Sequence, residues 1–363
     1  MARGIRGVDA LETRCVVCGK SSPLIAKTMG ACAECIRGRP EAVLPGLERI
    51  HAETRREFNL PAAPPRAGDG ARCALCVNEC LIAEGERGFC GPRTNARGKL
   101  VHLAGTAKKG ILQWYFDPLP TNCCAARVCE GSHQHNSKNL AVFYGACTMN
   151  CLFCQNWQYR WMSTQGKGMS AVELAAVADS RTFCACYFGG DPTPQMPHAL
   201  AVSRILARRG VRICWETNGS MSPKLLDRAV RLSLETGGCL KFDLKAHDEN
   251  LHKALTGVTN TRTLDNFARA ASYIPDRRDS PLLVGCTLLV PGYVDPKEVY
   301  SIARFISSLD STIPYSLLGF HPDFRLHDLP RTSVRHAEEA EQAARDAGLT
   351  NVHIGNRHLL SRD

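Results

Sequence analysis

From about residue 139 onward, short apolar segments alternate with segments of helical length, and this alternation constrains the fold more than any other feature. The apolar segments predict seven strands: Leu140–Tyr144, Cys184–Phe188, Val211–Trp215, Cys239–Leu244, Leu282–Val290, Tyr315–Gly319 and Val352–Ile354. The segments between them predict five helices: Ala171–Asp179, Ala199–Arg209, Pro223–Glu235, Pro296–Leu309 and Val334–Ala347. Ser170 with Glu173 predicts a capping box at the start of the first helix. Alternation of this kind predicts parallel βαβ units. A complete eight-unit barrel needs about 250 residues, so we expect an α/β fold with a partial barrel of six or seven units.

The composition excludes several classes of protein. The chain has 363 residues, 19 cysteines and a net charge of +10. No apolar run reaches the roughly 18 residues that span a bilayer, and the start of the chain lacks the apolar core of a secretory signal. We therefore expect a soluble, cytoplasmic protein with no membrane association. In a reducing compartment, so many cysteines indicate metal or redox chemistry rather than disulfides.

Proline, glycine and cysteine divide the first part of the chain. Residues 41–58 predict a helix, and the proline- and glycine-rich residues after it predict a linker because they sustain neither a helix nor a central strand. We expect a zinc-ribbon-like module at 1–60, a linker at 61–70, a cysteine-rich accessory segment at 71–138 and the partial barrel at 139–363.

The loop after the first barrel strand carries three closely spaced cysteines. Cys147, Cys151 and Cys154 follow the spacing C-x₃-C-x₂-C, with Phe153 just before the third. Three thiolates on one loop can hold three irons of a [4Fe–4S] cube and leave the fourth iron without a protein ligand. A structural zinc ion normally takes a fourth protein ligand, and none lies close by in the sequence. A zinc knuckle, or three packed cysteines, is the alternative interpretation.

At these residues the sequence resembles the radical S-adenosylmethionine (SAM) superfamily, whose motif is C-x₃-C-x-aromatic-C. The resemblance implies that the open iron binds SAM. It also implies reductive cleavage of SAM to methionine and a 5′-deoxyadenosyl radical, which then removes a hydrogen atom from the substrate. The cluster and SAM carry out the bond cleavage, and the protein orients SAM and the substrate.

The ends of later strands carry further motifs of this family. Gly189-Gly190-Asp191-Pro192 resembles its glycine-glycine-glutamate-proline turn, with an aspartate that keeps the acceptor for the SAM amino group but shortens its reach. Paired glycines let the backbone approach a ligand closely. Glu216-Thr217-Asn218-Gly219, Asp243-Leu244-Lys245 and Gly319-Phe320-His321-Pro322 resemble segments of glycyl-radical-enzyme activating enzymes, such as those of pyruvate formate-lyase. The resemblance implies that these residues form the SAM site: Phe153, Gly189, Gly190, Asp191, Pro192, Asn218, Asp243, Lys245 and His321.

A narrower resemblance covers roughly residues 70–357. The pattern from Cys73 to Asn95, the Cys154–Trp157 extension and the segment from Phe320 to Pro330 are similar to the radical SAM protein of AmmeMemoRadiSam systems. This similarity indicates the type of reaction far more than it indicates the substrate.

The remaining cysteines form separate groups. Cys15, Cys18, Cys32 and Cys35 have zinc-ribbon spacing, so we expect Zn²⁺ there, with a redox or iron site as the alternative. A second group can hold zinc or an auxiliary [4Fe–4S] cluster, because both take four thiolates: Cys73, Cys76, Cys80 and Cys90. A third group lies near His133 and His135, and three interpretations of it stay open, namely that it lines the mouth of the active site, supplies metal ligands or is a loop with incidental cysteines: Cys123, Cys124 and Cys129. Five cysteines on predicted strands are expected to be small core hydrophobes: Cys184, Cys186, Cys214, Cys239 and Cys286.

The sequence therefore predicts a radical SAM enzyme that activates a glycyl-radical-type protein. Modification of a peptide or small molecule is the alternative substrate class, and a non-enzymatic zinc or iron–sulfur protein is the alternative kind of function. The resemblance implies a flavodoxin or ferredoxin as electron donor. The positive charge leaves nucleic acid open, but no basic patch interleaved with aromatic residues supports it.

Overall fold

The computed structural model describes residues 12–121, 123–162 and 164–362. Its centre is an eight-stranded sheet in the order β14-β13-β12-β11-β10-β9-β8-β7, in which β8 to β14 are parallel and β7 is antiparallel to β8. The strands are β7 (Leu112–Pro118), β8 (Lys138–Tyr144), β9 (Thr182–Gly189), β10 (Arg212–Thr217), β11 (Leu240–Asp243), β12 (Leu283–Leu289), β13 (Tyr315–Gly319) and β14 (Val352–Gly355). Because the two outer strands do not pair with each other, the barrel is partial, as the sequence predicts.

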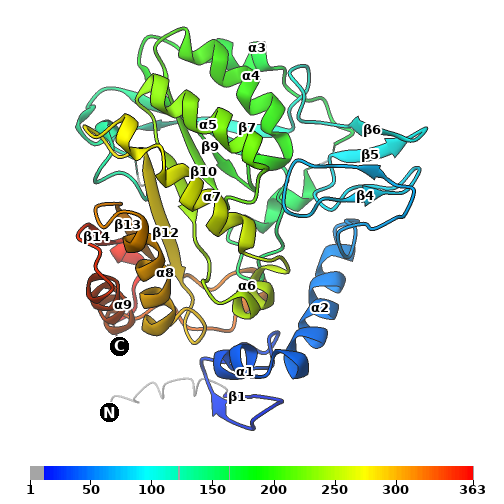
Figure 1. Cartoon of the computed structure of the whole chain (residues 1–363), viewed down its shortest axis with the longest axis vertical. Helices are drawn as coiled ribbons and strands as arrows, with labels where there is room; N and C mark the ends of the chain where they lie inside the picture. Colours follow the sequence, from blue (N-terminus) through cyan, green and yellow to red (C-terminus); the bar gives the residue numbers. More distant parts are fainter. Residues whose placement is uncertain (1–11, 122, 163, 363) are drawn as a thin grey trace, which may run out of the picture.

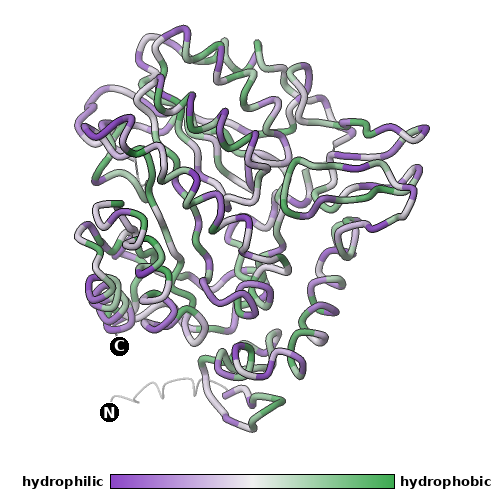
Figure 2. The backbone as a smooth tube through the Cα atoms, viewed as in Figure 1, coloured by the Kyte–Doolittle hydropathy of each residue, from purple (hydrophilic) through white to green (hydrophobic). Residues whose placement is uncertain are grey.

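Helices connect the parallel strands and cover the outer face of the sheet (Figure 1). They are α3 (Ala171–Ala176), α4 (Met196–Ala207), α5 (Pro223–Thr236), α6 (Glu249–Thr256), α7 (Thr261–Ala271), α8 (Pro296–Leu309) and α9 (Val334–Asp346). The predicted capping box is present, since Ser170 accepts from the Glu173 amide and Glu173 accepts from the Ser170 amide. The sequence did not predict α6, α7 or β7. In Figure 2 the helices carry both hydrophilic and hydrophobic colours, as expected for elements with one buried face.

The period-2 alternation of the strands separates two environments. In β10, Ile213 and Trp215 are fully buried, and the indole of Trp215 donates to the Ala229 carbonyl of α5 at 3.2 Å. Cys214 and Glu216 point to the opposite face, because successive side chains of a strand alternate. The outer face therefore holds the apolar core beneath the helices, and the inner face carries thiol and charged side chains.

The N-terminal part lies along one end of the barrel (Figure 1). It contains β1 (Thr13–Arg14), β2 (Ser21–Ser22), α1 (Ala33–Gly38), α2 (Pro40–Arg56), β3 (Ala71–Arg72), β4 (Leu81–Ile82), β5 (Arg93–Ala96) and β6 (Lys99–His102). Within the predicted linker, the Pro65 carbonyl accepts from the Leu81 amide at 2.9 Å, and the Arg66 guanidinium donates to the Asn78 carbonyl at 2.7 Å. The linker thus packs on the accessory segment, while the module boundaries stay a prediction.

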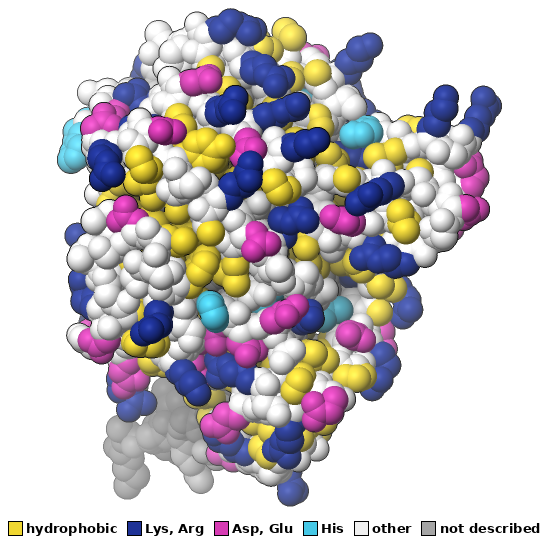
Figure 3. Space-filling view, in the orientation of Figure 1, with side chains coloured by type: hydrophobic (Ala, Val, Ile, Leu, Met, Phe, Trp, Pro, Cys, Tyr) yellow, Lys and Arg dark blue, Asp and Glu magenta, His cyan; other side chains and the backbone are white. Residues whose placement is uncertain are grey.

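The surface in Figure 3 carries basic side chains over the upper helices and at the end of the projecting β5–β6 hairpin, with acidic side chains between them. Among the described residues, no helix has both the length and the apolar character needed to cross a membrane.

Candidate active site

The loop from Cys147 to Cys154 follows β8 at the carboxyl edge of the sheet. Its backbone is fixed to α6, because the Asn150 amide donates to the Thr256 carbonyl at 2.8 Å and the Leu152 amide to the Leu255 carbonyl at 3.0 Å. Cys151 is buried, whereas Cys147 and Cys154 are half-buried. The three thiols are thus held on one rigid loop that remains partly open.

The paired glycines after β9 allow this loop to lie against the next strand. A Cβ atom on Gly190 would lie 2.2 Å from the Ala146 carbonyl oxygen, a distance that no side chain can take. Gly189 has a φ of +103°, a backbone conformation that side chains disfavour. The Asp191 amide then donates to the same Ala146 carbonyl at 2.8 Å. The glycine turn therefore holds the cysteine loop directly.

Asp191 is buried and accepts three hydrogen bonds from the protein. One carboxylate oxygen accepts from the Thr193 amide at 2.8 Å. The other accepts from the Thr217 hydroxyl at 2.9 Å and the Asn218 amide at 2.7 Å. Burial raises the pKa of Asp191, and these hydrogen bonds oppose that effect. Asp191 thus fixes the turn after β10, while its predicted contact with SAM stays a prediction.

That turn places Asn218 against the cysteine loop. Its side-chain nitrogen donates to the Thr148 hydroxyl at 2.8 Å and lies 3.7 Å from the Cys147 sulfur. The Met149 amide lies 3.4 Å from the same sulfur. Donors aimed at a sulfur stabilise the thiolate form that metals bind.

Asp243 and Lys245 meet at the end of β11. The Lys245 ammonium lies 3.2 Å from the Asp243 carboxylate and 5.6 Å from the centre of the Phe153 ring. Burial lowers the pKa of Lys245, but Asp243 and Cys151 outweigh it, and the pKa is raised. Burial raises the pKa of Cys151 to about 11, although Lys245 opposes the shift. A fixed positive charge thus faces the cysteine loop.

The structure places His321 less centrally. It follows β13 at the same edge of the sheet, but its ring is exposed and its Nδ1 lies 3.0 Å from the adjacent Pro322 carbonyl. Pro192 is buried beside Asp191 and leads into a short 3₁₀ helix, Thr193–Gln195.

The three thiols fit a cluster better than a single ion. Within the described ranges, only the group containing Cys15 brings three or more possible metal-binding atoms within 4.8 Å of one another. Cys147, Cys151 and Cys154 are therefore spaced more widely than four ligands of one tetrahedral zinc. Wider spacing suits an iron–sulfur cube, which places several atoms between its thiolates.

Comparison with known proteins identifies this region. Residues 141–306 match the radical SAM superfamily. This part of the chain is a radical SAM domain. It contains the cysteine loop and the motifs at the ends of β8, β9, β10 and β11. The match to this superfamily shows that the protein is an enzyme. The family implies a [4Fe–4S] cluster and SAM as cofactors.

Several curated relatives share the domain. An uncharacterized protein of Methanocaldococcus jannaschii is 26% identical over 78% of this chain and 81% of its own length. The pyruvate formate-lyase 1-activating enzyme of Escherichia coli is 26% identical over 50% of this chain and 73% of its own length. The isethionate sulfite-lyase activating enzyme of Oleidesulfovibrio alaskensis is 32% identical over 37% of this chain, but this match covers only 40% of that enzyme.

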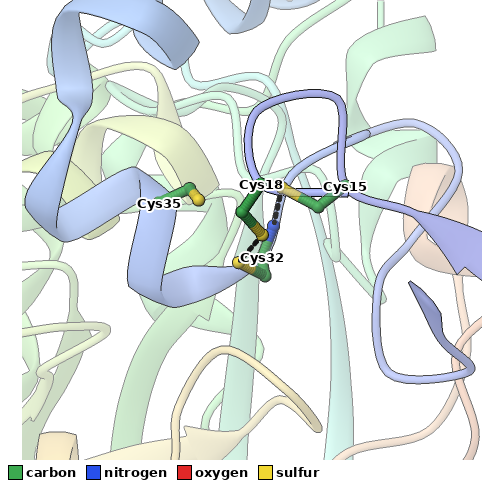
Figure 4. A group of neighbouring side chains, drawn as sticks. All are labelled: Cys15, Cys18, Cys32 and Cys35. Carbon is green, nitrogen blue, oxygen red and sulfur yellow. Dashed lines mark hydrogen bonds between the residues drawn. The ribbon is translucent and has the colours of Figure 1, made fainter. Parts of the chain in front are cut away.

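Beside the radical SAM domain, the first cysteine group is compact (Figure 4). The ligand atoms of Cys15, Cys18, Cys32 and Cys35 all lie within 4.8 Å of one another. The Cys18 and Cys32 sulfurs are 3.8 Å apart, which agrees with two ligands of a tetrahedral ion at about 2.3 Å each. These four residues could bind a metal ion.

The second group surrounds a small cavity instead. Cys73, Cys76, Cys80 and Cys90 all line one small cavity next to the radical SAM domain. Asn78 connects the two regions, since its side chain donates to the carbonyl of Thr148 on the cysteine loop at 2.7 Å.

The third group lies inside the partial barrel. Cys123 and Cys129 line a cavity together with four strand cysteines: Cys184, Cys186, Cys214 and Cys239. The prediction that these four are core hydrophobes is therefore wrong in one respect, because they face a cavity that also contains Glu216 and Lys241. Cys286 lies 3.0 Å from the Asp243 carboxylate, not in purely apolar surroundings. The signal that was missed is the recurrence of these residues at alternate strand positions.

Proposed function

We propose that the protein cleaves SAM reductively at a [4Fe–4S] cluster held by Cys147, Cys151 and Cys154. When bound, cluster and SAM supply an electron transfer that yields methionine and a 5′-deoxyadenosyl radical, which abstracts a hydrogen atom from the substrate. The observation that carries the proposal is the convergence of three widely spaced thiols with Asn218 and the Asp243–Lys245 pair inside a radical SAM domain.

The residues around the loop have separate tasks in this proposal. The Lys245 ammonium binds the methionine carboxylate, a charge-assisted contact that the buried surroundings strengthen. The Asp243 carboxylate orients Lys245 and accepts from the SAM amine or a ribose hydroxyl. Phe153 lies beside the adenine. Asp191 and Asn218 act as positioning residues, because both fix the loop that carries Cys147.

For the substrate, we propose a glycyl-radical-type protein, with a flavodoxin or ferredoxin as electron donor. Support comes from the names of two relatives, which are activating enzymes for pyruvate formate-lyase and isethionate sulfite-lyase. A peptide or small molecule is the second candidate, since sequence identity to these relatives is only 26–32%.

We also propose different metals for the two N-terminal groups. The compact Cys15 group suits one Zn²⁺. The group around the second, smaller cavity (Cys73, Cys76, Cys80 and Cys90) suits an auxiliary [4Fe–4S] cluster, because its sulfurs are not gathered at the scale of one ion. Two buried guanidiniums place positive charge beside this group. Arg55 donates a hydrogen bond to the Phe89 carbonyl, and Arg93 donates one to the Ala104 carbonyl. Such charge compensates the anionic thiolates of a cluster.

The decisive experiment is anaerobic reconstitution followed by dithionite and SAM, with 5′-deoxyadenosine as the product measured. We expect product from the unmodified protein and none from the Cys151→Ala variant. The matched control is Cys184→Ala, a half-buried cysteine outside the loop, which should retain product formation. Equal product from Cys151→Ala would refute the proposal.

A further inference from the structure

The inner face of the sheet carries a row of thiols that the radical SAM reaction does not use. Cys186 and Cys214 are paired neighbours on β9 and β10. The Cys214 and Cys239 sulfurs lie 3.9 Å apart across β10 and the start of β11. These three side chains face the same cavity, and we refer to them together as the thiol surface.

The segment before β8 adds further thiols to this surface. It places Cys123 against the strand cysteines, and an ion pair between Glu130 and Arg212 connects the segment with β10. Cys123 and Cys129 contact the same small cluster as Cys214 and Cys239. Thiols from four separate chain segments therefore meet at one place, although they are far apart in the sequence.

A buried positive charge lies against two of these thiols. The Lys241 side chain is only 2% exposed, and its ammonium donates to the Cys186 sulfur at 3.0 Å and the Cys123 sulfur at 3.1 Å. Glu216, the nearest carboxylate, is 3.5 Å away. A buried ammonium is costly without compensating negative charge. It is well placed to stabilise the anionic thiolates of a metal centre.

We propose that this surface is a second metal site within the barrel, with Cys123, Cys186, Cys214 and Cys239 as thiolate ligands of an iron–sulfur cluster. Thiolates select soft metals and iron–sulfur clusters over magnesium or calcium. A cluster fits better than one zinc ion, since no three of these sulfurs are gathered within 4.8 Å in the described structure. All four cysteines line one cavity of about 220 Å³, which has room for a multi-atom centre.

Contacts connect this site with the candidate active site. The Cys124 sulfur lies 3.9 Å from Glu216, and the Cys286 sulfur lies 3.0 Å from Asp243. Asp243 in turn holds Lys245. The proposed cluster thus borders the interior of the same barrel whose edge carries the cysteine loop.

The test starts from a variant that cannot assemble the radical SAM cluster, Cys147→Ala/Cys151→Ala/Cys154→Ala, so that its outcome is independent of SAM cleavage. Iron, sulfide and zinc are counted per chain after anaerobic reconstitution. Adding Cys123→Ser/Cys214→Ser should remove at least about two further irons, the content of the smallest common cluster. Adding Cys184→Ser/Cys286→Ser, a matched pair on the same inner face, should remove none.

Equal iron content in all three proteins would overturn the proposal, and so would the loss of zinc instead of iron. If the Cys123→Ser/Cys214→Ser combination does not fold, thiol labelling of the triple variant replaces it. Cys123 and Cys214 are half-buried, so a small alkylating reagent can reach them. We expect several-fold lower labelling of both in the iron-loaded protein than after chelation. Equal labelling would exclude the site.

Discussion

Replacement of Asp191 by alanine tests whether this carboxylate is mainly a positioning residue. The change removes the acceptor of two backbone amides, those of Thr193 and Asn218, in a place where the side chain is only 2% exposed. A buried donor left without a partner costs about 1–3 kcal/mol, so the two together predict a loss of about 2–6 kcal/mol. This is a large share of the roughly 5–15 kcal/mol by which most domains are stable.

The assay is urea unfolding of the reconstituted protein at pH 7, followed by circular dichroism. Asp227→Ala is the matched control, because Asp227 is a carboxylate paired with the half-exposed Arg269 on the surface. Surface pairs of this kind contribute about 0–1 kcal/mol. The Asp191→Ala variant should also lose iron from the cysteine loop, since the Asn218 turn is released. If both variants lost the same small stability and Asp191→Ala only weakened SAM binding, the positioning role would be refuted.

Three further predictions concern pH, metal and SAM. Burial lowers the pKa of His51 to about 4, so its neutral ring contributes stability that is complete above the unfolded pKa near 6.5 and declines as the pH falls toward 4. Between pH 7 and pH 5 this amounts to about 2 kcal/mol, and unfolding of His51→Gln should lose correspondingly less over that interval; an equal loss would contradict the assignment. Cys32→Ser should release one zinc per chain without changing the iron content, which elemental analysis measures; iron lost in its place would contradict zinc at this group. Lys245→Met should weaken SAM binding at least about tenfold, as expected when a charge-assisted contact of about 1.5–3 kcal/mol is lost, and calorimetry of the reconstituted protein measures this; unchanged affinity would remove Lys245 from the site.

Much of the barrel could be predicted because its signals are local. The strand Tyr315–Gly319 and the helix Pro296–Leu309 have the predicted bounds, since apolar runs and helix-start signals both lie within the segment itself. The edge strand β7 was not predicted, because it is antiparallel and largely exposed and therefore lacks the continuous apolar character of its neighbours. The short helices α6 and α7 were missed as well; they follow each other between β11 and β12, where the alternation predicts one crossover.

In the candidate site, too, some residues could be predicted from local sequence signals and others could not. The three loop cysteines could be found from their spacing, and Asp243 and Lys245 from their resemblance to a family motif at the end of a predicted parallel strand. The inner thiols could not, since a strand cysteine resembles any small apolar residue until its neighbours are known. Only the structure shows that Lys241 lies among them, although Cys214 and Glu216, like Cys239 and Lys241, are two residues apart and therefore share a face.

The most direct test of the central claim is electron paramagnetic resonance of the dithionite-reduced protein before and after addition of SAM. We expect a cluster signal that is absent from the Cys147→Ala/Cys151→Ala/Cys154→Ala variant and whose g values change when SAM binds. A signal that persists in this variant and is unaffected by SAM would contradict the assignment of these three thiols as the SAM-binding cluster site.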